Sequence, residues 1–598
     1  MQSQKYSVNQ HIIETLLAWV KAGEIAIPEI QRPFVWDSTK VRDLMDSLYQ
    51  GYPIGYIITW RNPDIRLKDG RLSEGKKILI DGQQRITALK AAILGEEVVN
   101  NEYQKIRIRI AFNPVDERFE VQNPAILKDN KWIPDIHPII TGEIKVLYLL
   151  RDYLKNNPEC IEDTIYNALN NLTNIVKKQI GLIELDHDLD IETVTEVFIR
   201  INSKGVVLSQ ADFAMSKIAA YELYDGSNLR KAIDYFSHMA VAPEFYNILK
   251  DGDKEFIKTE YFQKMTWLKD DREDLYDPDY TDVLRVAFTS KFNRGRLSDL
   301  VSLLSGRNFE TRTFEETIAE ESFHKLGDGV KDFMNENNFK KFMLIMRSAG
   351  FIDPSMIRST NAINFAYILY LKLRENKVEQ HIIESHVRRW YVYSILTGRY
   401  SGSPESLFDF DIKQISSRPF NDYLKEKEQG ELSSAFWDAE LVQSMNTSVA
   451  SSPYYKVYLA AQVKFQDKGF LSRDIFVRDL IKLKGDIHHL FPKSYLIKYG
   501  LDRGKYNQIA NYVLMQQEIN IRVGDKSPQE YFGKLIEQVN NGEKIYGAIS
   551  NMAELKSNLT MHCIPDSIFK MEIKDYDDFL SQRRMLMSMK IKNYYFSL

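Results

Sequence analysis

The sequence predicts an α+β protein that is mostly helical, because the pattern of apolar residues changes twice along the chain. Strand-like and helix-like patterns alternate over residues 1–225, which indicates a mixed α/β domain. Amphipathic helical patterns dominate residues 226–440, where strand signals fade. Residues 441–598 hold the densest group of polar residues typical of catalytic sites. We therefore expect three domains, at 1–225, 226–440 and 441–598.

The composition is ordinary for a folded globular protein, with 44% hydrophobic and 27% charged residues among 598. The net charge of −4 comes from 79 basic and 83 acidic residues, so a uniformly basic nucleic-acid coat is excluded, but a local basic groove is not. The two cysteines, Cys160 and Cys563, are too few for a disulfide framework or a thiolate zinc cluster. With no secretory signal and no long apolar run visible, we expect a cytoplasmic protein without membrane contact.

The first domain should begin with two helices. Ser7 can cap a helix that ends near Gly23, and a second helix should follow Ser38, with Val41, Leu44, Met45 and Leu48 on one apolar face. Strands are expected at 55–60, at 77–80 and, from its period of two, at 105–112.

A polar turn follows the strand predicted at 77–80. Gly82 permits a tight turn after Asp81, and a helix should begin near Gln83. The free N–H groups at the start of that helix favour an anion such as a phosphate, to which Arg85 could add a forked contact. The alternative is structural, with Arg32 and Arg85 paired with Asp37 or Glu29 inside the fold and Trp36 in the core.

Three blocks of sequence in the first domain, at 27–36, 80–89 and 197–205, resemble the ParB-like amino-terminal domain of GmrSD-type type IV restriction enzymes. The resemblance implies a domain that binds and hydrolyses a nucleoside triphosphate, GTP or another. By the same resemblance, the nucleotide site would be formed by Gln31, Arg32, Asp81, Gly82, Gln83, Gln84, Arg85, Asn202 and Lys204.

The last domain contains two adjacent histidines, His488 and His489, between apolar residues. Neighbours on an extended strand point to opposite faces, so one imidazole could hold a metal while the other faces water or substrate. Such a pair alone is more often structural than catalytic. However, Pro492 follows the pair, and two asparagines, Asn511 and Asn520, follow further along the chain.

This combination resembles the HNH, or ββα-metal, nuclease motif, and the stretch from Asn520 to Tyr531 is similar to the carboxy-terminal domain of the same restriction enzymes. The resemblance implies that His489 is the general base and that Asn511 orients it by a hydrogen bond. His488 and Asn520 would bind Mg²⁺ or Mn²⁺. Lys493 and Lys526 would contact DNA phosphates.

Basic residues surround this motif. Between Ile481 and Lys505 the sequence contains six lysines and arginines and two aspartates. This excess of positive charge favours phosphate contact without readout of base sequence. The six are Lys482, Lys484, Lys493, Lys498, Arg503 and Lys505. In the middle region, Arg388–Tyr393 with Arg399 and Tyr400 interleaves basic and aromatic residues. That stretch could hold nucleic acid, or it could be a helix with Trp390, Tyr391 and Ile395 packed inward.

Together the two resemblances imply an NTP-dependent, modification-sensing DNA endonuclease of the type IV restriction class. It would act on modified phage DNA, and a homo-oligomer is among the expected assemblies. By the resemblance, His488 stands where many HNH enzymes place an aspartate or histidine metal ligand. The alternative, favoured by the replacement of a carboxylate ligand by His488, is a nucleotide-regulated DNA-binding protein with an inactive HNH fold. A more distant alternative is an RNA-targeting defence toxin.

Overall fold

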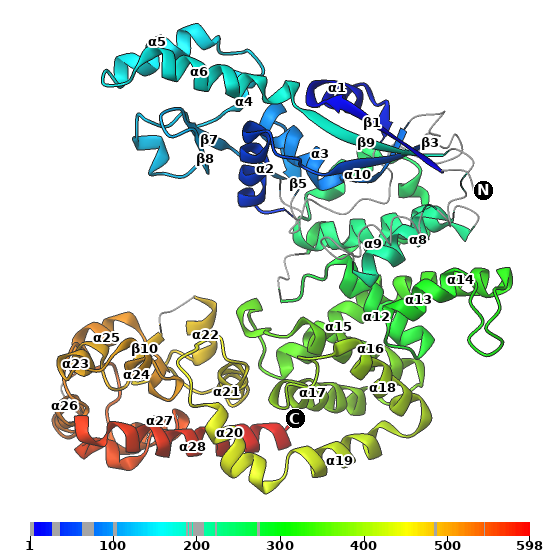
Figure 1. The fold of residues 1–598 in the computed structure, drawn as a ribbon. Coiled ribbons are helices and arrows are strands. Elements are labelled where there is room, and N and C mark those ends of the chain that lie inside the picture. Colours follow the sequence, from blue (N-terminus) through cyan, green and yellow to red (C-terminus); the bar gives the residue numbers. More distant parts are fainter. Residues whose placement is uncertain are drawn as a thin grey trace. The chain divides into compact units, whose positions relative to one another are not determined.

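The computed structural model divides the chain into two compact units, Met1–Lys231 and Ala232–Leu598, and each is described by itself (Figure 1). The fold is mostly helical with a small mixed sheet, as expected for the α+β class. The boundary expected near residue 440 lies inside the second unit, so the division into three domains stays a prediction. The structure describes residues 5–26, 36–61, 77–99, 105–186, 189, 194, 209–221, 224–271, 275–483, 487–542 and 544–598.

A five-stranded sheet forms the centre of the first unit, with strand order β1-β9-β3-β4-β2. The two outer pairs differ, because β1 runs antiparallel to β9 whereas β2 runs parallel to β4. Inside the sheet, β3 is parallel to β9 and antiparallel to β4. The strands are β1 (Tyr6–Ile12), β2 (Ile25–Ala26), β3 (Tyr56–Arg61), β4 (Lys77–Asp81) and β9 (Gln179–Leu185).

The helix expected from Ser7 is wrong in its first half. Residues Tyr6–Ile12 form the edge strand β1, and the helix α1 occupies only Ile13–Ala22 before it ends at Gly23 in the left-handed region, with a φ of 72°. Pairing with β9 supplies β1 with backbone hydrogen bonds from a segment far along the chain. This long-range pairing outweighs the local apolar pattern.

The other elements of the first unit surround this sheet. The strand expected at 105–112 is interrupted and forms the ends of two separate hairpins. The short strands are β5 (Val98–Val99), β6 (Lys105–Ile106), β7 (Ile110–Asn113) and β8 (Arg118–Val121). The helices are α2 (Ser38–Gln50), α3 (Gln83–Leu89), which continues into the π-helical turn η1 (Lys90–Leu94), α4 (His137–Ile140), α5 (Val146–Asn156), α6 (Glu162–Thr173) and α8 (Gln210–Ala220).

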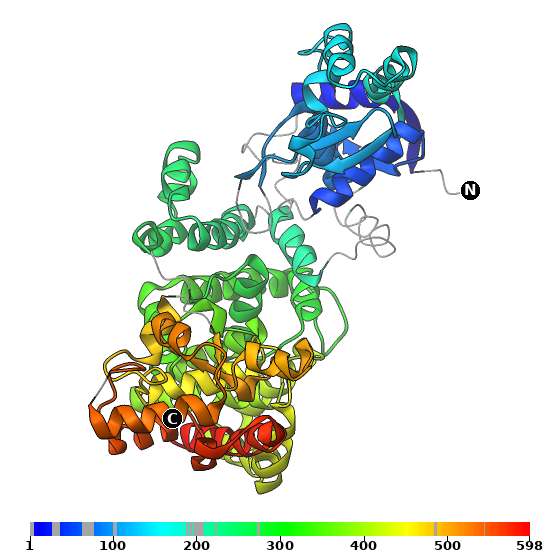
Figure 2. The same ribbon diagram turned by 90° about the vertical axis from the view of Figure 1, so that its left-hand side faces the viewer.

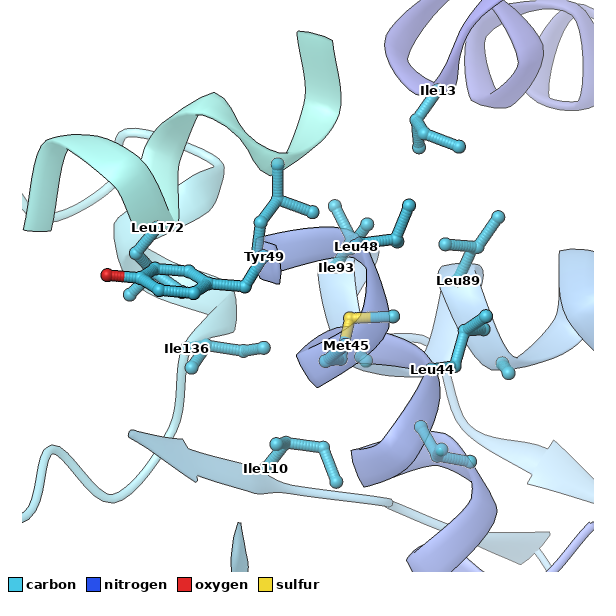
Figure 3. Packing of buried hydrophobic residues seen from close by; sticks show 14 of the residues in the cluster. Ile13, Leu44, Met45, Leu48, Tyr49, Leu89, Ile93, Ile110, Ile136 and Leu172 are labelled. Carbon is cyan, nitrogen blue, oxygen red and sulfur yellow. The ribbon is translucent and has the colours of Figure 1, made fainter. Parts of the chain in front are cut away.

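Helix α2 provides much of the core of the first unit. The Asp37 side chain caps this helix by accepting a hydrogen bond from the backbone N–H of Lys40 at 2.8 Å. The apolar face expected for α2 is confirmed, because all four of its predicted positions are buried. Figure 3 shows Leu44, Met45 and Leu48 of α2 in the same buried cluster as Leu89 and Ile93.

In the described residues of the second unit, the named elements are helices apart from one short hairpin. Helix α9 (Gly226–Val241) crosses the boundary between the units. The helices that follow are α10 (Phe245–Gly252), α11 (Glu260–Met265), α12 (Tyr280–Phe292), α13 (Leu297–Leu304), α14 (Glu316–Met334), α15 (Glu336–Ser348), α16 (Thr360–Glu375), α17 (Gln380–Leu396), α18 (Pro404–Ser417) and α19 (Phe420–Glu431).

The carboxy-terminal part of this unit encloses the hairpin. Helix α28, which is part of the red segment in Figure 2, packs against α21 and α17. The hairpin strands are β10 (Ile487–His489) and β11 (Tyr512–Leu514). The helices are α20 (Leu441–Ser444), α21 (Pro453–Lys464), α22 (Val477–Lys482), α23 (Lys493–Lys498), α24 (Arg503–Tyr506), α25 (Gln517–Val523), α26 (Pro528–Asn541), α27 (Met552–Met561) and α28 (Tyr576–Phe596). Within the described ranges, no helix is long and apolar enough to cross a membrane.

Candidate functional site

The two histidines lie on a short antiparallel hairpin. His488 is opposite Val513, and His489 is opposite Tyr512. His488 is buried whereas His489 is half-buried, which fits neighbours that point to opposite faces of a strand. Helix α25, which carries Asn520, follows the second strand directly. Around the expected residues the chain therefore has the order β10, α23, α24, β11, α25, and the two strands pair with each other.

His489 is held by a polar contact and by aromatic rings. Its Nε2 lies 3.0 Å from Oδ1 of Asn507, and its ring is perpendicular to that of Tyr512 at 5.3 Å. Burial lowers the pKa of His489, the hydrogen bond with Asn507 opposes this shift, and the charges of Lys493 and His488 lower it further. A neutral imidazole at neutral pH can accept a proton from water.

Asn511 has a different contact from the one we expected. Its Oδ1 accepts a hydrogen bond from the backbone N–H of Phe491 at 2.8 Å, and its Nδ2 donates to the carbonyl of Phe491 at 3.1 Å. This fully buried amide therefore fixes the turn that follows His489. The expected hydrogen bond from Asn511 to the imidazole is wrong, because the side chain turns inward to that backbone and Asn507 makes the contact instead.

Sequence reasoning missed Asn507. It lies in the loop between α24 and the second strand. It is not one of the residues on which the resemblance to the HNH motif rests. Its relation to His489 depends on how that loop folds back against the hairpin. The only local signal was its position beside Tyr506, in the stretch that contains both expected asparagines.

The expected metal ligands lie on the hairpin and on the helix after it. Asn520 is half-buried in α25, and its side chain makes no hydrogen bond within the described part of the chain. Asp486 lies outside the described residues. Within the described ranges, no group of three or more His, Cys, Asp and Glu side chains could hold a metal ion. A set of one imidazole and one amide would leave most coordination positions to water and phosphate, and it suits Mn²⁺ better than Mg²⁺, which prefers oxygen ligands.

The two lysines expected to contact phosphate differ in their surroundings. Lys493 is exposed at the start of α23, with its Nζ 5.4 Å from the ring centre of Tyr506. Lys526 donates from Nζ to the carbonyls of Arg522 at 2.9 Å and Val523 at 3.3 Å, so its ammonium group caps the end of α25. Phosphate contact by either residue stays a prediction.

In the first unit, the turn between β4 and α3 has the expected form. Gly82 adopts a φ of 96°, and a Cβ there would lie 2.4 Å from Cδ1 of Ile57, so only glycine fits. Arg85 donates from Nη1 to the carbonyl of Tyr56 at 2.8 Å and lies 3.7 Å from Oδ2 of Asp81. Arg85 thus ties the turn to β3, and its ion-pair partner is Asp81, not Asp37.

The remaining residues of the expected nucleotide site are only partly described. Gln83 is half-buried and Gln84 is buried, with both at the start of α3. Four others, Gln31, Arg32, Asn202 and Lys204, lie outside the described residues. The nucleotide site therefore stays a prediction.

The basic and aromatic stretch of the middle region is part of the core. Trp390 and Tyr391 are fully buried in α17. Arg399 donates from Nε to Oδ2 of the buried Asp411 at 2.8 Å, and the hydroxyl of Tyr400 donates to the same oxygen at 2.7 Å. Of the two interpretations of this stretch, inward packing is correct, because these side chains are paired and enclosed.

Comparison with known proteins supports one of the two resemblances. Residues 13–219 match the family model described as GmrSD restriction endonuclease, N-terminal domain. The chain is also 23% identical to an uncharacterized protein of Methanocaldococcus jannaschii, over 96% of this chain and 95% of that protein. Residues 13–219 are thus similar to a GmrSD-type amino-terminal domain, and the similarity to the Methanocaldococcus jannaschii protein extends over nearly the whole of both chains.

Proposed function

We propose that the protein is a metal-dependent DNA endonuclease of the restriction type, with its HNH site on β10, β11 and α25. The observation that carries the proposal is the half-buried His489, held by Asn507 on a hairpin that leads into the helix bearing Asn520. The GmrSD-type domain at 13–219 supports the restriction class and DNA as the substrate.

In the proposed reaction, neutral His489 takes a proton from the attacking water, and burial favours that neutral state. Asn507 keeps the ring in one orientation through Nε2. Asn511 holds the turn after His489, so that the strand bearing the base is fixed to the second strand. His488 and Asn520 would hold Mg²⁺ or Mn²⁺, which when bound would stabilise negative charge on the scissile phosphate and on the leaving oxygen.

The amino-terminal domain would make cleavage depend on a nucleoside triphosphate and on a DNA modification. The turn at Asp81–Arg85 would contribute to the nucleotide site, together with Gln31, Arg32, Asn202 and Lys204. Such control is physically reasonable, since an unregulated nuclease would damage the host's own DNA. The natural targets would be phage DNAs with modified bases or backbones.

Cleavage assays test the proposal directly. Plain plasmid and modified phage DNA would be incubated with Mg²⁺ or Mn²⁺, with and without GTP, ATP, CTP or UTP. His489→Ala should abolish strand breaks, whereas the matched control His381→Ala, at an exposed histidine on α17, should cut as the wild type does. Equal cutting by the wild type and His489→Ala would exclude the assigned mechanism.

The alternative is a nucleotide-regulated DNA-binding protein with an inactive HNH fold. The observation that favours it is the imidazole of His488 at a position where many HNH enzymes have a carboxylate ligand. It predicts DNA binding and nucleotide hydrolysis without strand breaks under any metal. A protein that degrades RNA and leaves both DNAs intact would point to the RNA-targeting alternative.

A further inference from the structure

Four of the basic residues around the hairpin fall into two groups according to their partners. Lys498 forms an ion pair with Asp525, and both side chains are exposed. Lys526 is bound to backbone carbonyls at the end of α25. By contrast, the side chains of Lys493 and Arg503 make no ion pair or hydrogen bond with any part of the chain that the structure describes, although both are exposed.

Lys493 and Arg503 lie beside the same aromatic cluster as His489. The ring of His489 is 5.3 Å from that of Tyr512 and 6.3 Å from that of Tyr506. Lys493 extends over Tyr506 from α23, and Arg503 begins α24, the helix that ends at Tyr506. Arg503 and Tyr506 are three residues apart on α24, so they lie on the same face of that short helix.

Helix α24 is fixed by a cap at its first turn and by a hydrogen bond from α28, and these contacts keep Arg503 at this position. The Asp502 carboxylate caps the helix by accepting from the backbone N–H of Lys505 at 3.0 Å. The hydroxyl of Tyr576, from α28, donates to the carbonyl of Lys505 at 3.0 Å. The Asp502 carboxylate is thus used by the backbone of α24, and the charged ends of Lys493 and Arg503 stay available to a ligand.

We propose that Lys493 and Arg503 form a clamp that holds the phosphate backbone of duplex DNA beside His489, and that Lys498 does not take part. This inference rests on the proposed nuclease function and names the residues that hold its substrate. Unpaired cations beside a proton acceptor would bring adjacent phosphates to the hairpin without reading bases. A lysine already neutralised by an aspartate gains less, because a phosphate would have to displace that partner.

The salt dependence of DNA binding tests the clamp. The full-length protein would be titrated, in EDTA, against a fluorescent unmodified duplex at several salt concentrations, and anisotropy would give the affinity. The slope of log K against log salt is negative, and each lost phosphate contact makes it less steep by about 0.9. Lys493→Gln and Arg503→Gln should each show this change, and the double variant should show about 1.8. Lys498→Gln, the matched control on α23, should leave the slope close to that of the wild type.

An unchanged slope in the double variant would overturn the clamp, as would an equal change in Lys498→Gln. Tighter binding of an RNA of the same length than of the DNA duplex would also overturn it. Because the assay contains no metal, its result is independent of cleavage. If the wild type cuts DNA and the double variant has the wild-type slope, the nuclease function stands and the clamp is excluded. If the double variant has a shallower slope and the wild type never cuts DNA, the clamp stands and the nuclease function is excluded. Circular dichroism would confirm that each variant is folded.

Discussion

Oδ1 of Asn507 lies 3.0 Å from Nε2 of His489, so an amide outside the family motif holds the imidazole of the proposed base. This contact makes the loop after α24 part of the site. An amide oxygen can only accept, so in the tautomer that suits this contact Nε2 carries the hydrogen and Nδ1 is left to accept a proton.

Asn507→Ala should lower the cleavage rate by about 10- to 100-fold, because the imidazole loses the partner that orients it. Global stability should change little, since Asn507 is only half-buried. The measurement is the cleavage rate at saturating DNA, with the thermal midpoint as the control for folding. A variant that cuts at the wild-type rate would show that Asn507 does not position the base.

Asn511→Ala should destabilise the hairpin by about 2–4 kcal/mol, because it leaves the backbone N–H and carbonyl of Phe491 buried without their partner. Chemical denaturation followed by circular dichroism measures this loss. Asn511→Ala should lose activity and stability together, whereas Asn507→Ala should lose activity with little change in stability. A variant with unchanged stability would contradict a structural role for Asn511.

Gly82→Ala should destabilise the first unit more than Gly142→Ala does. Both glycines have a positive φ, 96° and 78°, so both substitutions carry the backbone cost of about 1 kcal/mol. Only at Gly82 would the new methyl group meet another side chain, Cδ1 of Ile57 at 2.4 Å, whereas nothing lies within 4 Å at Gly142. Thermal denaturation of the two variants isolates the steric part, and equal midpoints would contradict the tight packing of this turn.

The stability of the second unit should fall as pH rises toward 7, because burial raises the pKa of Asp282 to about 7. The folded state then holds a proton that the unfolded state releases at its ordinary pKa near 3.8, so ionisation opposes folding above that value. Between pH 5 and pH 7 this costs about 2–3 kcal/mol. Asn364 donates from Nδ2 to Oδ1 of Asp282 at 2.6 Å.

Asp282→Asn removes this titration, so its stability should depend less on pH than that of the wild type. Thermal midpoints of the two proteins at pH 5 and pH 7 give the comparison. The wild type should lose more between the two values than the variant does. Parallel loss in both proteins would show that Asp282 is ionised across the whole range.

Local patterns were enough to predict several elements. The apolar face of α2 and the Gly82 turn each depend on residues close together in the chain. Such features follow from periodicity, from turn chemistry and from the spacing of motifs.

Contacts between distant segments decided the rest. Pairing with β9 made residues 6–12 a strand, and burial against Asp411 removed Arg399 from the candidate nucleic-acid surface. The fold of the loop after α24 placed Asn507, rather than Asn511, at the imidazole, and Asp525 neutralised Lys498 while Lys493 stayed unpaired among the described residues. Sequence alone determined which residue types the hairpin carries. Only the tertiary structure decided which of them meet, because partners far apart in the chain leave no mark on local periodicity.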